Sequence, residues 1–132
     1  MIYGIGHDVV EIERIKDMFD RGIGEKLAQR ILTTNELALS GMKKRPVEFL
    51  CGRFAAKEAV TKAFGYGIGK IIGLHDIEIF ADSYGKPYIE IYKPAWQRLE
   101  LDSQQYQIHL SITHERHIAS AFVVIEHKQQ SI

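Results

Sequence analysis

The sequence has few of the features that mark secreted, membrane-spanning or nucleic-acid-binding proteins. It contains 1 cysteine, Cys51, which cannot form an internal disulfide, so we expect a reducing compartment. No run approaches the roughly eighteen apolar residues of a membrane helix, and the start has neither the basic nor the apolar region of a signal peptide. Because 17 basic and 17 acidic residues give a formal net charge of +0, no general field attracts nucleic acid. We therefore expect a cytoplasmic protein in which any anion binding is local.

The chain has only 3 prolines and shows no internal repeat, low-complexity run or evident linker. Its 132 residues are enough for one hydrophobic core, so we predict a single domain over residues 1–132. Strands are predicted over residues 2–10, 76–80, 87–92, 107–113 and 118–126. The second and third of these form one predicted hairpin, and the fourth and fifth form another. Helices are predicted over residues 11–19, 25–31, 34–40, 47–64 and 94–101, with a capping box at Thr33 and Glu36 and a basic turn over residues 41–46. Helices early and antiparallel strands late predict an α+β fold.

The long helix over residues 47–64 carries a carboxylate, Glu58, within an almost entirely apolar surface. A helix that is apolar all round is normally buried, and a buried carboxylate is costly unless it is paired, hydrogen-bonded or bound to a metal. Lys62, four residues on, offers an ordinary partner. Against this, Arg53 and Lys57 form a like-charge pair that indicates an anion bound between them. An anion beside a cation-binding carboxylate suggests phosphate and a metal ion.

Asp8, at the end of the first predicted strand, is the second candidate. With Glu11 it has the spacing of a capping box, so one interpretation is that Asp8 only caps the first helix. The other is that Asp8 meets Glu58, because one or two carboxylates with substrate phosphates are a usual arrangement for magnesium. The residues alone leave both interpretations open.

A glycine-rich run over residues 65–70 gives a weaker signal. A dinucleotide-binding loop should follow a strand and open a helix, whereas this run follows a helix. It predicts a helix cap at Gly65 and equally allows the backbone to approach a ligand closely.

Histidines and a serine near the end of the chain give another weak signal. Ser111 and His114 lie close together, but the Gly-x-Ser-x-Gly motif of many hydrolases does not occur. The spacing of His109, His114 and His117 matches no zinc signature. We expect His114 to contact phosphate or to transfer a proton.

Four segments of the chain form a combined pattern. They are Gly4-Ile5-Gly6-His7-Asp8-Val9-Val10-Glu11-Ile12-Glu13-Arg14-Ile15, Gly52-Arg53-Phe54-Ala55-Ala56-Lys57-Glu58-Ala59 with Lys62-Ala63, Gly65-Tyr66-Gly67-Ile68-Gly69, and Ser111-Ile112-Thr113-His114. In this order they resemble the holo-[acyl-carrier-protein] synthases, the small class of 4'-phosphopantetheinyl transferases. The resemblance spans the whole chain and implies the 4'-phosphopantetheinyl transferase fold, with an antiparallel sheet packed against a long central helix.

The resemblance also implies a reaction. The 4'-phosphopantetheine arm of coenzyme A would move to a serine of apo-acyl carrier protein, releasing adenosine 3',5'-bisphosphate, in support of fatty acid biosynthesis. The family implies an Mg²⁺-dependent homotrimer with sites between subunits. Asp8 and Glu58 match its Mg²⁺ ligands and, with the phosphate contact Lys62, form the implied catalytic group. The implied coenzyme A contacts are Arg53, Lys57, Lys62, Gly65 and His114.

The same resemblance implies an acidic carrier protein as partner. Arg14, Met18 and Arg21 lie at i, i+4 and i+7 of the first predicted helix and offer cations around an apolar contact. Two residues depart from the family pattern. His7 stands where many relatives have an aliphatic residue, and Thr113 replaces the second serine of a Ser-x-Ser-His segment.

Two other functions agree with parts of the sequence. A non-catalytic coenzyme A or nucleotide-binding module would retain the basic residues of the central helix without needing both carboxylates. An acyl hydrolase would need Cys51 or Ser111 as nucleophile, although Cys51 in an apolar helix surface is expected to be inert core. For the transferase, the general base stays open between Glu58, a metal-bound water and His114.

Overall fold

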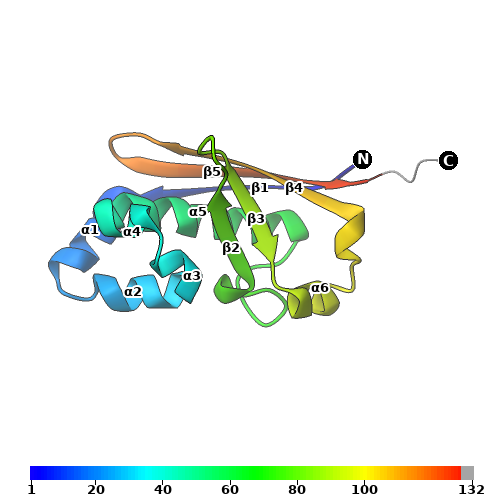
Figure 1. Ribbon diagram of the computed structural model, residues 1–132, viewed down its shortest axis with the longest axis horizontal. Coiled ribbons are helices and arrows are strands. Elements are labelled where there is room, and N and C mark those ends of the chain that lie inside the picture. Colours follow the sequence, from blue (N-terminus) through cyan, green and yellow to red (C-terminus); the bar gives the residue numbers. More distant parts are fainter. Residues whose placement is uncertain (129–132) are drawn as a thin grey trace.

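The computed structural model describes residues 1–128 and contains a three-stranded antiparallel sheet that covers a long helix (Figure 1). The elements in chain order are β1 (Ile2–Glu11), α1 (Ile12–Asp20), α2 (Gly24–Ile31), α3 (Thr34–Leu37), α4 (Ser40–Lys44), α5 (Pro46–Phe64), η1 (Leu74–Asp76), β2 (Ile77–Ala81), β3 (Pro87–Ile91), α6 (Lys93–Leu99), η2 (Ser103–Gln105), β4 (Tyr106–His114) and β5 (Ile118–His127). The predicted α+β class is confirmed, because all five predicted helices precede the sheet hairpin β4–β5.

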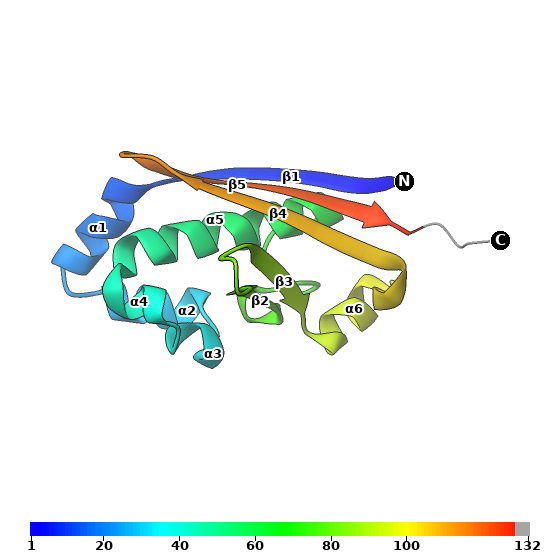
Figure 2. The same cartoon turned by 45° about the horizontal axis from the view of Figure 1, so that its top comes forward.

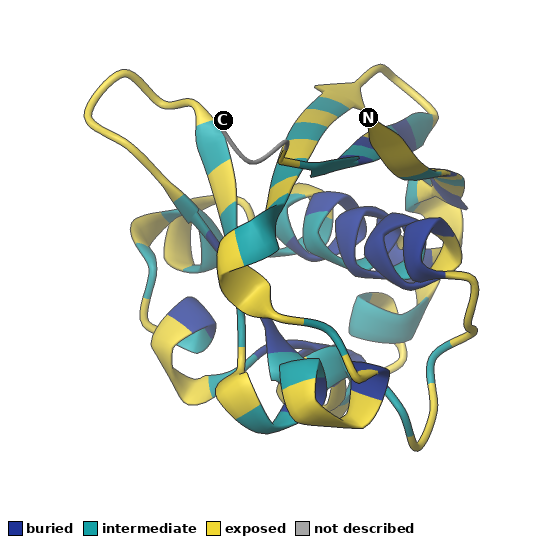
Figure 3. Ribbon diagram, turned by 90° about the vertical axis from the view of Figure 1, so that its right-hand side faces the viewer, coloured by how far each residue is buried: buried dark blue, intermediate teal, exposed yellow. Residues whose placement is uncertain are grey.

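Helix α5 occupies the centre of the molecule, and most of its surface is buried (Figure 3). Pro46 supplies a fixed φ in the first turn, and Gly65 ends the helix with a left-handed φ of 89°, as predicted. Although α5 is long and largely apolar, neither it nor any other helix within residues 1–128 meets the length and hydropathy needed to cross a bilayer.

The sheet has the strand order β1-β5-β4, with both neighbouring pairs antiparallel. One face packs on α5 through the fully buried side chains of Ala119, Ala121, Val123 and Ile125, and the helices lie on that side of the sheet (Figure 2). The predicted hairpin of β4 and β5 is confirmed. Its turn follows His114, so the segment from Ser111 to His114 lies within β4.

The shorter elements depart from the prediction around α3, which ends at Leu37 and not at Ser40, and around α4. β2 and β3 form the predicted hairpin, and Thr33 with Glu36 forms the predicted capping box at the start of α3. The basic turn expected over residues 41–46 is wrong, because Ser40–Lys44 form the helix α4. A Cβ at Gly41 would lie 2.5 Å from the Phe49 ring, so α4 packs tightly on α5. This tertiary contact stabilises a helix that local sequence did not indicate.

Candidate active site

Strand β1 lies directly against α5 because two glycines leave no side chains between them. A Cβ added at Gly4 would lie 1.8 Å from the backbone oxygen of Ala63, and one added at Gly6 would lie 1.8 Å from that of Ala59. A larger residue at either position would push the strand off the helix. Because side chains alternate along a strand, Asp8 follows the two glycines on the face toward α5. The glycines therefore position Asp8 against the helix that carries Glu58.

Asp8 pairs with Lys62 of α5. The Lys62 ammonium (Nζ) lies 2.9 Å from Asp8 Oδ1 and donates a hydrogen bond of 3.3 Å to the backbone oxygen of His7. The capping interpretation of Asp8 is wrong, because Asp8 lies inside β1 and the N-cap residue of α1 is Glu11. The i,i+4 pair of Glu58 with Lys62 does not occur among the ion pairs of residues 1–128, since the ammonium turns toward β1.

Glu58 lies close enough to Asp8 for their charges to interact. Partial burial raises the pKa of the Glu58 carboxyl, the negative charge of Asp8 raises it further, and Lys62 lowers it. Two carboxylates that repel each other gain stability from an additional cation. The structure thus brings Asp8 and Glu58 together, as the metal-site interpretation requires.

Both carboxylates line one cavity of about 500 Å³. The lining side chains come from β1, α1, α2 and α5, and they are Asp8, Val9, Val10, Arg14, Ile15, Met18, Leu27, Phe54 and Glu58. Arg14 and Met18, two of the three predicted carrier contacts, therefore border the cavity of the carboxylates. The third, Arg21, is the C-cap residue of α1 and lies outside this lining.

The donor set at this cavity fits magnesium. Mg²⁺ is usually held by one or two carboxylates together with waters and substrate phosphates, and Asp8 and Glu58 supply two carboxylates. Within residues 1–128 no cluster of three or more His, Cys, Asp or Glu side chains could hold a metal ion by itself, whereas structural zinc needs four ligands. His109 instead pairs with Glu126 at 3.0 Å.

Lys57 has a different environment from the one predicted. Its side chain is fully buried, and its ammonium donates to Glu36 Oε1, to the backbone oxygen of Ile31 at 2.8 Å and to that of Leu74 at 3.0 Å. An ammonium has three donors, so none is left for coenzyme A. The structure thus engages the Lys57 ammonium entirely within the protein. Because Glu36 supplies the negative charge beside Lys57, no bound anion is required to offset the repulsion between Lys57 and Arg53.

Arg53 remains available for an anion. Its guanidinium carbon lies 4.4 Å from the centre of the Phe49 ring, a cation–π contact that holds the side chain against α5. The Arg53 Nε is buried and has no hydrogen-bond partner among the described residues. Burial lowers the pKa of Arg53, and the nearby charge of Glu36 raises it. A phosphate oxygen would supply the missing acceptor.

The imidazole of His114 lies against α5 at Gly52. A Cβ at Gly52 would lie 2.7 Å from His114 Nε2, and this nitrogen lies 3.1 Å from the backbone oxygen of Glu48. The glycine inside a helix was the sequence signal for this approach, and it was missed. Glu58 lies about 9 Å further along the helix axis, and Gly65 about 20 Å from Gly52. The predicted site residues thus follow α5 over a length suited to an elongated ligand.

The two candidate nucleophiles of the hydrolase alternative lie in unsuitable places. Cys51 is fully buried, and burial followed by the charge of Glu48 raises its pKa to about 11, so the thiolate hardly forms. Ser111 is exposed on β4, and in the register of the sheet it pairs with Phe122. Neither residue lines the cavity of the carboxylates.

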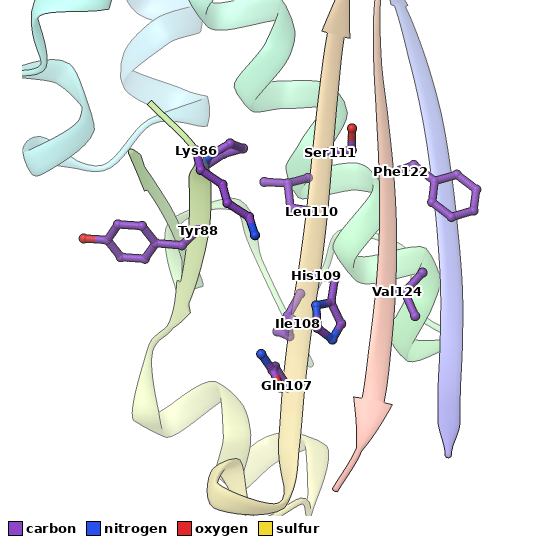
Figure 4. A pocket seen from close by; sticks show the side chains of 10 residues that line it. Lys86, Tyr88, Gln107, Ile108, His109, Leu110, Ser111, Phe122 and Val124 are labelled. Carbon is purple, nitrogen blue, oxygen red and sulfur yellow. The ribbon is translucent and has the colours of Figure 1, made fainter. Parts of the chain in front are cut away.

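A second cavity, of about 330 Å³, lies between the β2–β3 hairpin and the edge of the sheet (Figure 4). The side chain of Lys86 extends from the hairpin toward β4, and His109 and Phe122 border the cavity from the sheet (Figure 4). Ser111 and His109 line it, but none of the residues predicted for the transferase site does. It was not anticipated because its two sides are far apart in the sequence.

His7 lies away from the carboxylates. Its Nε2 is 2.8 Å from the hydroxyl oxygen of Ser120, and its ring centre is 5.8 Å from that of Phe122. Both partners belong to β5, so the His7 side chain points to the face of the sheet opposite α5. The position that departs from the family pattern therefore contacts the outer face and not Asp8.

Comparison with known proteins identifies relatives over almost the entire chain. A family model described as the 4'-phosphopantetheinyl transferase superfamily matches residues 4–121. A protein named holo-[acyl-carrier-protein] synthase from Bacillus pumilus (strain SAFR-032) is 48% identical over 130 residues, which cover 96% of this chain and 97% of the relative.

Two crystal structures have the same fold. The holo-[acyl-carrier-protein] synthase of Neisseria meningitidis aligns with a TM-score of 0.83 and 40% identity, covering 96% of this chain and 99% of its own. A holo-(acyl-carrier-protein) synthase from Bacillus anthracis str. Ames, solved in complex with CoA (3',5'-ADP), aligns with a TM-score of 0.76 and 42% identity, covering 97% and 99%. The resemblance and the fold predicted from the four sequence segments are confirmed.

Proposed function

This chain belongs to the 4'-phosphopantetheinyl transferase superfamily, and from this premise we propose how it works. It transfers the 4'-phosphopantetheine arm of coenzyme A to a serine of apo-acyl carrier protein and releases adenosine 3',5'-bisphosphate, in support of fatty acid biosynthesis. The observation that carries the mechanism is that Asp8 and Glu58 line one cavity while Lys62 contacts Asp8. A soluble carrier and a single, buried free cysteine agree with a cytoplasmic enzyme.

The enzyme depends on Mg²⁺, which Asp8 and Glu58 would hold. When bound, the ion would neutralise charge on the pyrophosphate and help to stabilise the leaving group. Without a cation, the two carboxylates would repel a polyanionic substrate. The raised pKa of Glu58 is consistent with a site adapted to a cation.

Lys62 supplies a mobile positive charge. Its side chain is half exposed, so its contact with Asp8 is weakly held and the ammonium can reach a substrate phosphate. There it stabilises negative charge that develops on the leaving oxygen. The acceptor hydroxyl must lose a proton near Glu58. His114 lies about 9 Å along the helix and serves as a coenzyme A contact instead of the base.

Coenzyme A binds along α5. Arg53 and His114 contact phosphate oxygens at one end, Lys62 contacts the pyrophosphate, and Gly65 lets the backbone approach the ligand at the other end. The unpartnered Nε of Arg53 supports the first of these contacts. Lys57 contributes only indirectly, because its ammonium is fully engaged.

The acidic carrier protein docks on α1. Arg14 and Met18 border the cavity of the carboxylates, so a carrier bound there would present its serine to the reacting phosphate. Arg21 extends the positive surface beyond the end of α1. Opposite charges would steer the carrier and fix its orientation.

The protein assembles as a homotrimer with sites at subunit contacts. Large apolar side chains stay exposed on the outer face of the sheet, with Ile5 55%, Val9 47% and Phe122 47% exposed. Such a patch is typical of a surface that a partner covers. The cavity of Figure 4 shares Phe122 with this face, so a second copy would border it. Phe122→Glu should give monomers by light scattering, whereas a variant that stays trimeric would contradict this interface.

The transfer reaction is tested by mass spectrometry. Apo-acyl carrier protein mixed with the enzyme, coenzyme A and Mg²⁺ should gain the mass of one phosphopantetheine group. EDTA should prevent the gain, and added Mg²⁺ should restore it. Absence of any gain would reject the transferase, and a gain that resists EDTA would reject only the metal requirement. Glu58→Gln keeps the size of the side chain and removes its charge, so it should lower the rate about a hundredfold or more.

A further inference from the structure

The fully buried pair of Lys57 and Glu36 joins several elements of the fold. Both side chains have 0% exposure. Lys57 extends from α5 and donates to Glu36, to the last residue of α2, Ile31, and to the first residue of η1, Leu74. One ammonium therefore fixes three segments to α5.

Glu36 completes this network. Its Oε1 accepts a hydrogen bond of 2.9 Å from the backbone N–H of Thr33, and its Oε2 accepts one of 3.0 Å from the N–H of Ile79. The first bond starts α3, and the second holds strand β2. Through Lys57, the carboxylate links both elements to α5. Every polar atom of the pair is used, as a buried charge requires.

The contact with Leu74 matters most, because Leu74 directly follows the glycine-rich segment 65–73. Side chains added at Gly67 or Gly69 would meet no atom within 4 Å, so this part of the segment has few packing contacts of its own. At its start, the N–H of Gly65 donates to the backbone oxygen of Lys62 at 3.0 Å. Glycines leave the chain many conformations, so the position of the segment depends on how its ends are held.

Three side chains hold the far end of segment 65–73. Arg98 Nε donates to the oxygen of Ile71 at 2.9 Å, and Asp76 accepts from the N–H of Gly73 at 2.7 Å. Lys57 holds Leu74 at 3.0 Å. Of these three contacts, only that of Lys57 comes from α5, the helix of Glu58. The N–H groups of Gly65 and Tyr66 already tie the start of the segment to α5, and the side chain of Ile72 is fully buried. Lys57 adds a side-chain hydrogen bond from α5 that fixes the far end.

We propose that Lys57 and Glu36 are positioning residues, which hold segment 65–73 in the place where coenzyme A binds relative to Asp8 and Glu58. The proposal rests on the proposed function, because that function assigns Gly65 to the coenzyme A site. Lys57 acts through Leu74 and touches neither substrate. Loss of the pair therefore weakens coenzyme A binding and leaves carrier binding at α1 intact.

A role in stability alone predicts a different result. Removing one partner would leave a buried unpaired charge and lower stability, whereas replacing both by apolar residues of similar size often restores it. The double variant Glu36→Leu with Lys57→Met therefore separates the two roles. It removes the charges together with their hydrogen bonds to the backbone of Leu74, Ile31, Thr33 and Ile79. A purely structural pair would leave the kinetics of the folded double variant normal.

The test measures the double variant at a temperature where circular dichroism shows it to be folded. Its KM for coenzyme A should rise about tenfold or more, with the KM for the carrier unchanged. Calorimetry with coenzyme A alone should show the same loss of affinity. Unchanged affinity for coenzyme A, or equal losses for both substrates, would overturn the proposal.

A matched control variant lowers the stability of the protein by a change outside segment 65–73. Leu50→Ala leaves a cavity in the fully buried part of α5, far from Gly65, and should cost about 2–5 kcal/mol of stability. Its KM for coenzyme A should equal that of the wild type. If Leu50→Ala raises this KM as much as the double variant does, general loosening explains the effect and the proposal fails. A wild-type protein without transfer activity would instead reject the proposed function.

Discussion

Two lysines of α5 each meet a carboxylate from another part of the chain, and the two pairs differ in burial. Lys57 and Glu36 have 0% exposure each, whereas Lys62 and Asp8 are 50% and 19% exposed. The buried ammonium has three fixed acceptors, while the exposed one has a carboxylate and a longer contact to a backbone oxygen. Water can replace the partner of an exposed charge but not that of a buried one. Burial therefore keeps the first pair from contacting a substrate and leaves the second available for one.

The largest expected effect is on the free energy of unfolding, which should distinguish the buried pair from the exposed one. Lys57→Met leaves Glu36 as an unpaired buried charge and should lower the free energy of unfolding by about 3–5 kcal/mol. Lys62→Met breaks an exposed pair and should change it by less than about 1 kcal/mol. Urea unfolding followed by circular dichroism measures both values. Equal losses would break the comparison.

For the catalytic rate, the exposed lysine and not the buried one should matter directly. Lys62→Met should lower kcat by about 10²–10³, because the ammonium stabilises charge in the transition state, while the protein stays as stable as the wild type. Lys93→Met, which removes an exposed lysine at the start of α6, is the control and should retain full activity. A Lys62→Met enzyme with a normal kcat would show that this lysine is not catalytic.

A smaller effect is expected at the carrier surface. Arg14→Glu places a negative charge beside the cavity and should raise the KM for the acidic carrier about tenfold at low salt. Binding of coenzyme A, measured by calorimetry, should be largely unchanged. Lys16→Glu reverses an exposed charge on the same helix outside this cavity, and its effect should be weaker. Equal losses for both substrates of Arg14→Glu would reject this docking surface.

The smallest effect concerns Glu58 and stability. Its pKa is raised above the usual value of 4.5, first by burial and then by Asp8. The folded chain thus binds this proton more tightly than the unfolded chain, so stability falls as the pH rises from 4.5 through the raised pKa. Glu58→Gln removes this loss. In EDTA and near neutral pH, its free energy of unfolding should exceed that of the wild type by less than about 1 kcal/mol, which thermal unfolding would show as a higher midpoint. The difference should vanish at about pH 4. An Asp17→Asn control, which changes an exposed residue of α1, should show no such trend.

Periodicity and capping signals predicted α5 and both hairpins closely, because these signals are local. The role of Lys57 could not be predicted in this way. Its like-charge neighbour Arg53 suggested an anion, but the actual counterion, Glu36, lies 21 residues earlier in the chain. Glu36 itself was recognised only as a cap, since the capping box explains one of its oxygens. The second oxygen binds Ile79, from a strand 43 residues away.

The sequence by itself determined the residue types of the site, the apolar central helix and the family, because these depend on local pattern and on order along the chain. It left Asp8 open between a cap and a metal ligand, and Glu58 between an ordinary pair and a site. Only the tertiary structure excluded the cap and the ordinary pair. Gly4 and Gly6 bring β1 into contact with α5, and Lys62 then turns to Asp8 and leaves Glu58 beside it. Partners this far apart in sequence are chosen by packing, which no local pattern encodes.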